Sequence, residues 1–216
     1  MNSIKEKVAK ILLDINAIAL NAKKPFRYTS GILSPIYTDC RLLISFPKQR
    51  KIIKDLYVDA IKNEHVSFEV AAGTSTAGIP WATLIAYTFN IPMIYVRGSQ
   101  KQHGKRNQIE GQIKKGQHAI IIEDLISTGS SSIETVKAIR SVDASAFYVF
   151  SIMTYGLKKA KDNFKQNNIK LITLTDFQTI VAIAQKFNYI NKKDQEIILN
   201  WAIGPTSWGK KMGFEV

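Results

Sequence analysis

Two adjacent carboxylates followed by a small, hydroxyl-rich turn form the stretch of this sequence best suited to chemistry. Glu123 and Asp124 come directly after the apolar run 120–122, and the turn occupies residues 127–131. Residues 132–139 have helical spacing, so the turn is expected at a helix N-terminus. Unpaired backbone N–H groups and the helix dipole favour a phosphate there, and small side chains let the backbone approach it. The two carboxylates suit a pair of ribose hydroxyls.

The order of residues here resembles the 5-phosphoribosyl-1-pyrophosphate (PRPP) signature of type I phosphoribosyltransferases. In that signature, four apolar residues, an acidic pair and two more apolar residues precede a turn rich in Thr, Ser and Gly. The resemblance implies a PRPP-binding segment made of Glu123, Asp124, Leu125, Ile126, Ser127, Thr128, Gly129, Ser130 and Ser131, with Asp124 also taking part in catalysis. The alternative is a strand ending in acidic residues before an ordinary Ser/Thr helix cap.

Two further segments could contact the pyrophosphate of PRPP. Ser75 and Thr76 lie in a loop of small residues that permits close backbone approach, while Arg97, Lys101 and His103 lie in a long basic segment. A loop of about 20 residues is unusual in a compact domain unless it is functional. Pyrophosphate gains charge as it leaves the anomeric carbon, and Lys101 and His103 can donate a charge-assisted hydrogen bond or a proton to it. A solvated, flexible connector is the alternative reading of this segment.

Other motifs narrow the resemblance to orotate phosphoribosyltransferases. Their N-terminal signature is similar to the spaced residues Phe26, Ser30, Gly31, Ser34, Pro35, Ile36, Tyr37, Asp39 and Arg41. Their catalytic loop is similar to Tyr95-Val96-Arg97, Lys101-x-His103-Gly104 and Ile109-Glu110-Gly111. With Thr76-Ala77-Gly78-Ile79-Pro80 and the PRPP segment, the resemblance covers roughly residues 1–155.

The resemblance implies transfer of phosphoribose from PRPP to orotate, which yields orotidine 5′-monophosphate and pyrophosphate in pyrimidine synthesis. It implies that Mg²⁺ is held mainly by PRPP itself and not by side chains, because this hard ion readily uses substrate phosphate oxygens and water. It also implies a homodimer in which Arg97, Lys101 and His103 reach the PRPP of the neighbouring subunit.

For the base, the resemblance implies that the flat orotate ring stacks against Tyr37. Ser30, Gly31 and Ser127 are expected to supply polar contacts, and Arg41 is expected to bind the orotate carboxylate. Two alternatives are open: Tyr37 as a core aromatic residue with its hydroxyl satisfied, and Arg41 as a structural ion-pair partner of Asp39.

The sequence departs from the family pattern at several positions. Gly98 follows the loop arginine where many members have lysine, and Thr29 stands where some have lysine before Ser-Gly. Ser130 replaces a glycine often found in the PRPP turn, which matters if that residue needs a positive φ. No arginine occurs in residues 153–156, where some members have one that touches orotate.

Composition limits the classes of protein that fit. A chain of 216 residues is long enough for one domain with a full core, and its single cysteine, Cys40, excludes an internal disulfide. Charged residues interrupt residues 1–20, so neither a signal peptide nor a membrane span is expected, and we predict a soluble cytoplasmic protein. The net charge of +13 favours an anionic partner, but the lysines are scattered along predicted helices and turns, which argues against nucleic acid.

The elements that must position these residues alternate along the chain. Apolar spacing after Ser3, with Glu6 completing a capping box, predicts a helix to about residue 21, and another helix covers 47–63. Short strands or loops are expected over 25–41. Further strands are predicted at 68–72, 92–96, 118–123, 146–154 and 170–174, and further helices at 78–89, 131–140 and 157–167. From residue 176 the chain is expected to be mostly helical, then irregular through 204–209.

This alternation predicts an α/β fold with a central, mainly parallel sheet flanked by helices, similar to that of type I phosphoribosyltransferases. Ligands bind at the carboxyl ends of the strands in such sheets. We expect one domain over residues 1–216, in which about 1–45 and the C-terminal segment form a base-binding hood, together with a mobile catalytic loop.

Three functional hypotheses follow from these features. The first is orotate phosphoribosyl transfer. The second is phosphoribosyl transfer to another base, which needs the PRPP turn but not the N-terminal signature. The third is a nucleic-acid-binding regulator that senses PRPP, which the positive charge supports, although no added recognition domain is visible in the sequence.

Overall fold

A six-stranded sheet forms the centre of the structure, a computed structural model that describes residues 3–28, 30–98 and 108–214. Its strand order is β10 (Lys170–Asp176), β9 (Ser145–Thr154), β8 (His118–Ile126), β5 (Val70–Thr74), β6 (Met93–Val96) and β7 (Ile109–Glu110). All neighbouring pairs are parallel except β6 and β7, which are antiparallel. The predicted mainly parallel sheet is therefore confirmed.

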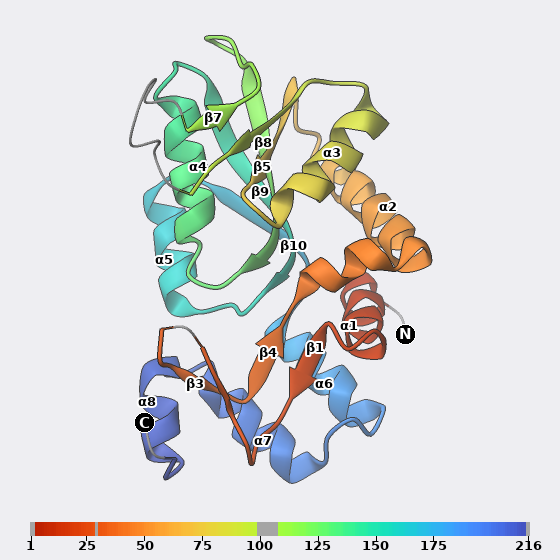
Figure 1. Ribbon diagram of the computed structural model, residues 1–216, viewed down its shortest axis with the longest axis vertical. Helices are drawn as coiled ribbons and strands as arrows, with labels where there is room; N and C mark the ends of the chain where they lie inside the picture. Colours follow the sequence, from red (N-terminus) through yellow and green to blue (C-terminus); the bar gives the residue numbers. More distant parts are fainter. Residues whose placement is uncertain (1–2, 29, 99–107, 215–216) are drawn as a thin grey trace.

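Helices cover both faces of this sheet (Figure 1). The helices of the large sheet are α1 (Ile4–Asp14), α2 (Pro47–Asn63), α3 (Gly78–Phe89), α4 (Ser130–Arg140) and α5 (Lys158–Gln166). Ile120 and Ile122 of β8 pack into one apolar core, whereas Ile121 packs into the core on the opposite face. A strand buried on both sides has no polar face, which explains its unbroken apolar run.

The N-terminal and C-terminal parts of the chain lie together beside this sheet (Figure 1). Their elements are β1 (Ile18–Leu20), β2 (Phe26–Arg27), β3 (Leu33–Ser34), β4 (Ile36–Thr38), a 3₁₀ helix η1 (Cys40–Ser45), α6 (Phe177–Lys186), α7 (Lys192–Trp201) and α8 (Pro205–Lys211). The Trp201 indole Nε1 donates to the Leu33 carbonyl oxygen at 3.2 Å. Trp201 is almost wholly buried, so this bond ties α7 to the N-terminal hairpin through the core.

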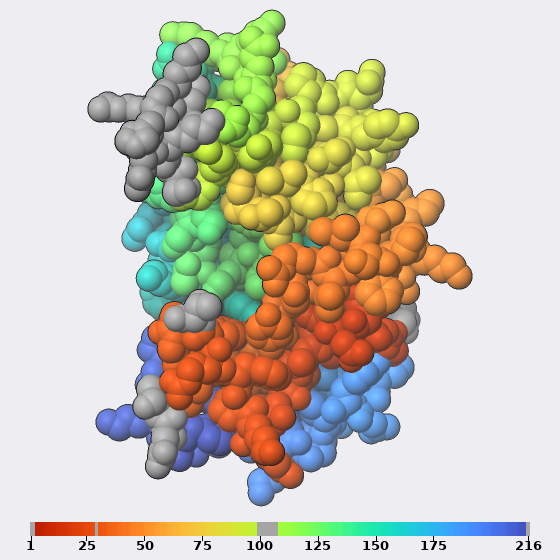
Figure 2. Space-filling view, in the orientation of Figure 1, coloured from red at the N-terminus to blue at the C-terminus, as the bar shows by residue number. Residues whose placement is uncertain are grey.

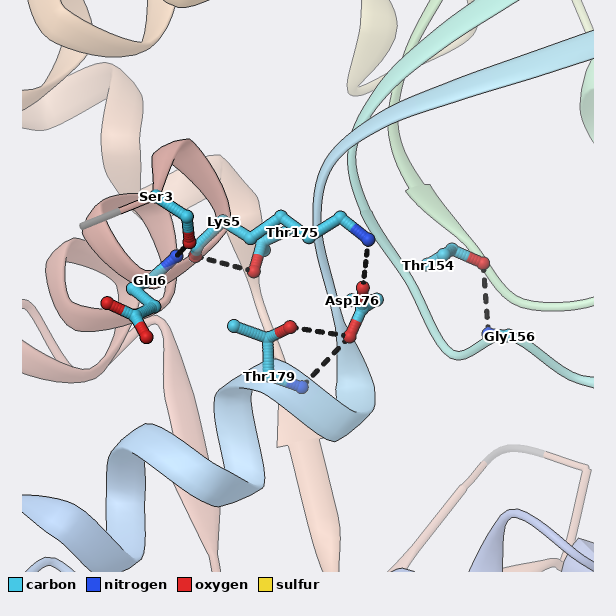
Figure 3. Close-up of polar contacts among 8 residues, drawn as sticks. All are labelled: Ser3, Lys5, Glu6, Thr154, Gly156, Thr175, Asp176 and Thr179. Atoms are coloured by element: carbon cyan, nitrogen blue, oxygen red, sulfur yellow. Dashed lines mark hydrogen bonds and ion pairs between the residues drawn. The ribbon is translucent and has the colours of Figure 1, made fainter. Parts of the chain in front are cut away.

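Polar contacts join α1 to the C-terminal half of the chain (Figure 3). The Ser3 hydroxyl accepts from the Glu6 backbone N–H at 3.3 Å, as expected for a capping residue. Lys5 Nζ donates to Asp176 Oδ2 at 2.7 Å, and the Thr175 hydroxyl donates to the Lys5 carbonyl oxygen at 2.9 Å. The first helix is therefore fastened to the end of β10.

Most predicted elements are confirmed. Helices α2 and α3 have the predicted bounds, and the other predicted strands and helices after residue 63 differ from the observed ones by at most three residues at an end. The short strands expected in 25–41 are also present. None of the helices in the described part of the chain is both long and apolar enough to cross a membrane.

The prediction of a first helix that continues to about residue 21 is wrong. Helix α1 ends at Asp14, and Asn16 adopts a left-handed conformation with φ of 55°. The chain then reverses and forms β1, which pairs with β4. The apolar spacing continues past the helix end because Ile18 is buried in the strand, so periodicity alone extended the helix too far.

Two further predictions need correction. The segment expected to be irregular, 204–209, contains the start of α8, with Pro205 in its first turn. Gly209 is tolerated inside that helix because a Cβ there would lie 3.0 Å from the Leu33 side chain, so glycine lets α8 pack closely on β3. The long basic segment also contains the short strand β7, which pairs with β6.

Gly78→Ala is expected to lower the free energy of unfolding by about 2 kcal/mol or more. A Cβ at Gly78 would lie 2.3 Å from the Ile122 carbonyl oxygen, so α3 and β8 would have to separate. In an uncrowded helix the same change stabilises by about 0.5–1 kcal/mol. Urea unfolding measures the effect.

Gly98→Ala is the control for this prediction, because no atom of the described residues lies within 4 Å of a Cβ at Gly98. Equal unfolding midpoints for the two variants would contradict the close approach between α3 and β8.

Candidate active site

A pocket of about 310 Å³ opens where β5 and β8 end, at the carboxyl edge of the sheet. Its lining residues are Thr38, Asp39, Arg41, Ser75, Thr76, Ala77, Glu123, Asp124, Leu125 and Ser131. Figure 2 shows the orange N-terminal segment, the yellow start of α3 and the green end of β8 approaching one another on one face. The expected convergence of the acidic pair and the small-residue loop is confirmed, because strands β5 and β8 are hydrogen-bonded neighbours.

Glu123 is a buried carboxylate with specific hydrogen-bond partners. Its side chain accepts from the Ser132 hydroxyl at 3.3 Å and from the Asp124 backbone N–H at 3.1 Å, and the residue is only 6% exposed. The Tyr57 hydroxyl donates to its carbonyl oxygen at 2.5 Å. Burial, followed by the charge of Asp124, raises the pKa of Glu123 well above its usual range. Burial also raises the pKa of Asp124. Ionising both carboxyl groups at the end of β8 is therefore costly in the ligand-free protein.

The turn after β8 leads into the N-terminus of α4, as expected. Gly129 is the N-cap with φ of 78°, and a Cβ there would lie 2.6 Å from the Phe164 ring. Ser130 is the first helical residue, so the positive φ falls on the retained glycine and the serine replacement is compatible with the fold. Asn163 Nδ2 donates to the Thr128 carbonyl oxygen at 3.0 Å, so α5 supports the turn from outside.

The loop after β5 brings Ser75 and Thr76 to the opposite side of this pocket. The peptide bond between these two residues is cis. The Ser75 hydroxyl oxygen is buried and has no hydrogen-bond partner among the residues that the structure describes. A buried polar atom without a partner at the wall of a pocket is suited to a ligand acceptor.

The residues expected to contact the base are only partly brought together. Tyr37 on β4 is 45% exposed and its ring centroid lies 5.7 Å from that of Phe26, so it is not a core aromatic residue. Arg41 lines the pocket, but its Nε also donates to Asp39 Oδ1 at 2.6 Å, which matches the alternative reading as an ion-pair partner. The Arg41 guanidinium lowers the pKa of Asp39.

Ser30 and Gly31 lie elsewhere in the single chain. They line a separate pocket of about 250 Å³ between the β2–β3 hairpin and α8, which also contains Arg27 and Lys210. Ser127 is exposed at the start of the turn after β8 and does not line the 310 Å³ pocket.

The basic segment is only partly described. Arg97 follows β6, and its Nε lies 3.3 Å from Glu110 Oε1. Its Nε and Nη2 atoms are buried and make no hydrogen bond within the described parts of the chain. Arg97 does not line the 310 Å³ pocket. Lys101 and His103 lie outside the described residues, as does the central part, 99–107, of the predicted mobile loop.

Sequence reasoning missed several residues around the pocket. Thr38 and Asp39 line it. Asp39 was named in the N-terminal motif and as a possible ion-pair partner of Arg41, but not as a site residue. Tyr57 supports Glu123 from α2, and no local motif marks it. Cys40 lies beneath the site, where burial followed by the charges of Asp124 and Asp39 raises the pKa of its thiol well above the usual range. A neutral, fully buried thiol is a poor nucleophile.

A larger cavity of about 750 Å³ lies between the ends of β9 and β10 and the helices α5, α6 and α7. Thr154, Gly156 and Asp176 line it (Figure 3). The Asp176 carboxylate is already occupied there, because it caps α6 through Thr179 and pairs with Lys5. None of the predicted PRPP residues that the structure describes lines this cavity, so volume is a poor guide to the chemistry of this protein.

Comparison with known proteins agrees with this geometry. Residues 46–186 match the phosphoribosyl transferase domain family. An orotate phosphoribosyltransferase of Coxiella burnetii is 46% identical over 208 residues, which cover 96% of this chain and 99% of that protein. An orotate phosphoribosyltransferase of Listeria monocytogenes is 44% identical, and the match covers 96% of this chain and all of that protein.

Solved structures are similar over most of the chain. Orotate phosphoribosyltransferase from Aeropyrum pernix superposes with a TM-score of 0.74 at 24% identity, covering 85% of this chain and 99% of that one, which bears on the fold alone. UMP synthase of Leishmania donovani gives a TM-score of 0.75 at 26% identity. That match covers 91% of this chain and 42% of the longer Leishmania chain.

Glu123→Gln is expected to stabilise the ligand-free protein increasingly as pH rises. Because the folded-state pKa is raised, the carboxyl contributes stability that is fully present below its ordinary pKa of 4.5 and is lost as pH rises through the folded-state value. Glutamine does not ionise and avoids this loss. Urea unfolding from about pH 4 to about pH 8 should show the variant gaining on the wild type as pH rises.

Glu134→Gln is the matched control, because the Glu134 side chain is 62% exposed on α4. A stability difference between Glu123→Gln and wild type that is the same at every pH would contradict the raised pKa.

Proposed function

The chain belongs to the orotate phosphoribosyltransferases, and we propose that the 310 Å³ pocket is where it transfers 5-phosphoribose from PRPP to orotate. The products are orotidine 5′-monophosphate and pyrophosphate, in pyrimidine biosynthesis. The mainly parallel α/β fold expected for a type I phosphoribosyltransferase is confirmed. The observation that best supports the site is the meeting of the acidic pair, the Ser75–Thr76 loop and the N-terminus of α4 around one pocket.

The two ends of PRPP have separate candidate partners. Backbone N–H groups and hydroxyls of residues 127–131 suit the 5′-phosphate, because they lie at the N-terminus of α4. The carboxylates of Glu123 and Asp124 accept hydrogen bonds from the 2′ and 3′ hydroxyls. Ser75 and Thr76 face the pyrophosphate, and the unpartnered Ser75 hydroxyl supports that assignment.

Catalysis consists of stabilising the departing pyrophosphate and positioning the base. The C1′–pyrophosphate bond breaks as positive charge develops on the ribose, and the base nitrogen forms the new bond to C1′. The nitrogen gives up its proton in this step, and the departing pyrophosphate can take up a proton in exchange. Lys101 and His103 donate to the leaving oxygen, so they act most strongly once that oxygen has gained charge. Asp124, beside the ribose, is placed to stabilise the positive charge on the sugar. Closure of the basic loop excludes water, which would otherwise attack the same carbon.

The residues at the pocket fit a Mg²⁺ ion that enters with PRPP. Burial raises the pKa of both Glu123 and Asp124, so negative charge is costly there and a cation brought by the substrate offsets it. PRPP oxygens and water would supply the ligands, and no side chain is assigned to the ion. When bound, Mg²⁺ neutralises pyrophosphate charge.

The small lobe formed by residues 1–45 and helices α6–α8 is proposed to be the hood that holds orotate. The exposed Tyr37 ring can stack on a flat base. The proposed polar contacts from Ser30 and Gly31 require the β2–β3 hairpin to move toward the 310 Å³ pocket, because both residues line a separate pocket in the single chain. Ser127 is the third proposed polar contact. Arg41 retains guanidinium donors beyond those used by Asp39, so it remains the proposed partner for the orotate carboxylate.

A homodimer with shared sites is proposed for two reasons. Arg97 does not line the pocket of its own chain, yet two of its buried guanidinium nitrogens make no hydrogen bond within the described parts. An anionic ligand on the neighbouring subunit would satisfy them. A reducing cytoplasm suits the single buried cysteine and the phosphorylated substrate.

The assay is the loss of orotate ultraviolet absorbance on mixing protein, PRPP and Mg²⁺. Orotate alone among orotate, adenine, hypoxanthine and uracil is expected to react, and chelation of Mg²⁺ should abolish the signal because the pyrophosphate charge is then uncompensated. Turnover of another base without orotate turnover would retain the PRPP site and overturn the base assignment. Absence of any turnover by folded protein would contradict the function.

Lys101→Ala is expected to lower kcat far more than it weakens PRPP binding, since its partner is charged mainly in the transition state; a loss of about 100-fold is reasonable for one such donor. Lys114→Ala, an exposed lysine later in the same basic segment, is the control. Equal losses in kcat and PRPP affinity would contradict the role.

Mixing Lys101→Ala subunits with Asp124→Ala subunits tests the shared site. Heterodimers should regain activity, because one of their two sites then has both an intact loop and an intact acidic pair. No recovery in verified heterodimers would place the loop in the site of its own chain.

A further inference from the structure

Two buried hydroxyls connect the segments proposed to bind the opposite ends of PRPP. Thr135 is on α4, one turn after the residues that face the 5′-phosphate, and Thr74 is the last residue of β5, directly before Ser75. Their hydroxyl oxygens are 3.2 Å apart. Thr135 is 1% exposed and Thr74 is 3% exposed, so neither hydroxyl is available to bulk water.

The contact between Thr135 and Thr74 differs from the usual hydrogen bond of a helical threonine, whose hydroxyl donates only to a carbonyl oxygen in the preceding turn. The Thr135 hydroxyl also lies 3.1 Å from the Ser131 carbonyl oxygen, so its one proton has an acceptor within its own helix and another on β5. A helix-internal acceptor would satisfy the donor without Thr74. The second contact instead joins two segments that are 61 residues apart in the chain. Both segments reach the pocket, because Ser131 at the start of α4 and Ser75 after β5 are among its lining residues.

We propose that Thr135 and Thr74 are positioning residues that fix the distance between the 5′-phosphate turn and the pyrophosphate loop. This inference rests on the proposed assignment of the two ends of PRPP. Neither hydroxyl touches the substrate; each holds in place a segment that does. The contact therefore favours a ligand that spans both segments at once over one that fills either alone.

The physical basis is preorganisation. A ligand with two linked anionic ends gains affinity when both sites are held at the spacing of the ligand, because the second contact then forms without further ordering of the protein. If the distance between the turn and the loop fluctuates, ribose 5-phosphate and pyrophosphate each still bind their own segment. PRPP then binds more weakly, because part of its binding free energy is used to fix that distance. The same fluctuation displaces C1′ from the base, and small displacements of reacting atoms lower turnover.

The test compares PRPP with its two halves, ribose 5-phosphate and pyrophosphate, by calorimetric titration in the presence of Mg²⁺. Thr135→Val removes the hydroxyl and keeps the branched shape, while Thr135→Ser retains the hydroxyl. Thr74→Val removes the same contact from the other side. Thr88→Val on α3 is the matched control, because the Thr88 hydroxyl donates to the Leu84 carbonyl oxygen at 2.8 Å and joins no second segment.

We expect Thr135→Val to weaken PRPP binding by about fivefold, the fold-change that corresponds to one lost hydrogen bond. Each half should bind within about twofold of wild type, because each segment stays intact. Turnover should fall as well, with Thr135→Ser restoring both properties and Thr88→Val changing neither. The double variant Thr74→Val/Thr135→Val should be no weaker for PRPP than either single variant, since all three lack the same contact.

Equal weakening of PRPP and of both halves would overturn the proposal, because it would indicate a general loss of structure. Unchanged PRPP affinity in folded Thr135→Val would overturn it too, as would additive losses in the double variant. If Thr135→Val does not fold, Thr74→Val decides by the same measurements. Failure of the proposed site itself has a different signature: in the wild type, ribose 5-phosphate and pyrophosphate would not compete with PRPP.

Discussion

The burial of Glu123 at the end of the central strand is the constraint on which the rest of the site depends. A carboxylate removed from water is costly unless hydrogen bonds compensate, and here they come from Ser132 and from the backbone of Asp124. Tyr57 fixes the adjacent carbonyl from α2. Helices from both faces of the sheet therefore converge on one residue, and this fixes the direction of the acidic pair before any ligand arrives.

The neighbouring strands extend this constraint into a pocket. Parallel pairing brings the ends of β5 and β8 side by side, so the loop of small residues and the acidic pair line one pocket. Gly78 lets the start of α3 approach the Ile122 carbonyl oxygen, and Gly129 lets the phosphate turn lie on Phe164. In both places a missing Cβ, and not an added functional group, shapes the site.

The elements that could be predicted from the sequence are those whose apolar pattern and residue composition indicate the same kind of secondary structure. The apolar run before Glu123, the helix that begins at Pro47 and the turn that leads into α4 all have local signals, and the structure confirms these elements. The predicted end of α1 was wrong because buried apolar side chains continue past Asp14, across the change from helix α1 to strand β1. Spatial neighbours with no local signal escaped prediction, as Tyr57 and the pair Thr74 and Thr135 show. Whether Arg41 can bind orotate depends on how much of its guanidinium the Asp39 carboxylate occupies, and the spacing of residues in the sequence does not determine this.

The packing of the first 40 residues against the last helices has a consequence for synthesis on the ribosome. The sheet β5, β8 and β9 and its covering helices are complete once β10 has emerged. The N-terminal hairpin, in contrast, has no partner for the Leu33 carbonyl until Trp201 is made, and no cover for its side chain until Gly209 follows. The earliest strands of this chain are thus among the last to reach their native contacts, so nascent chains expose apolar hairpin surface throughout elongation.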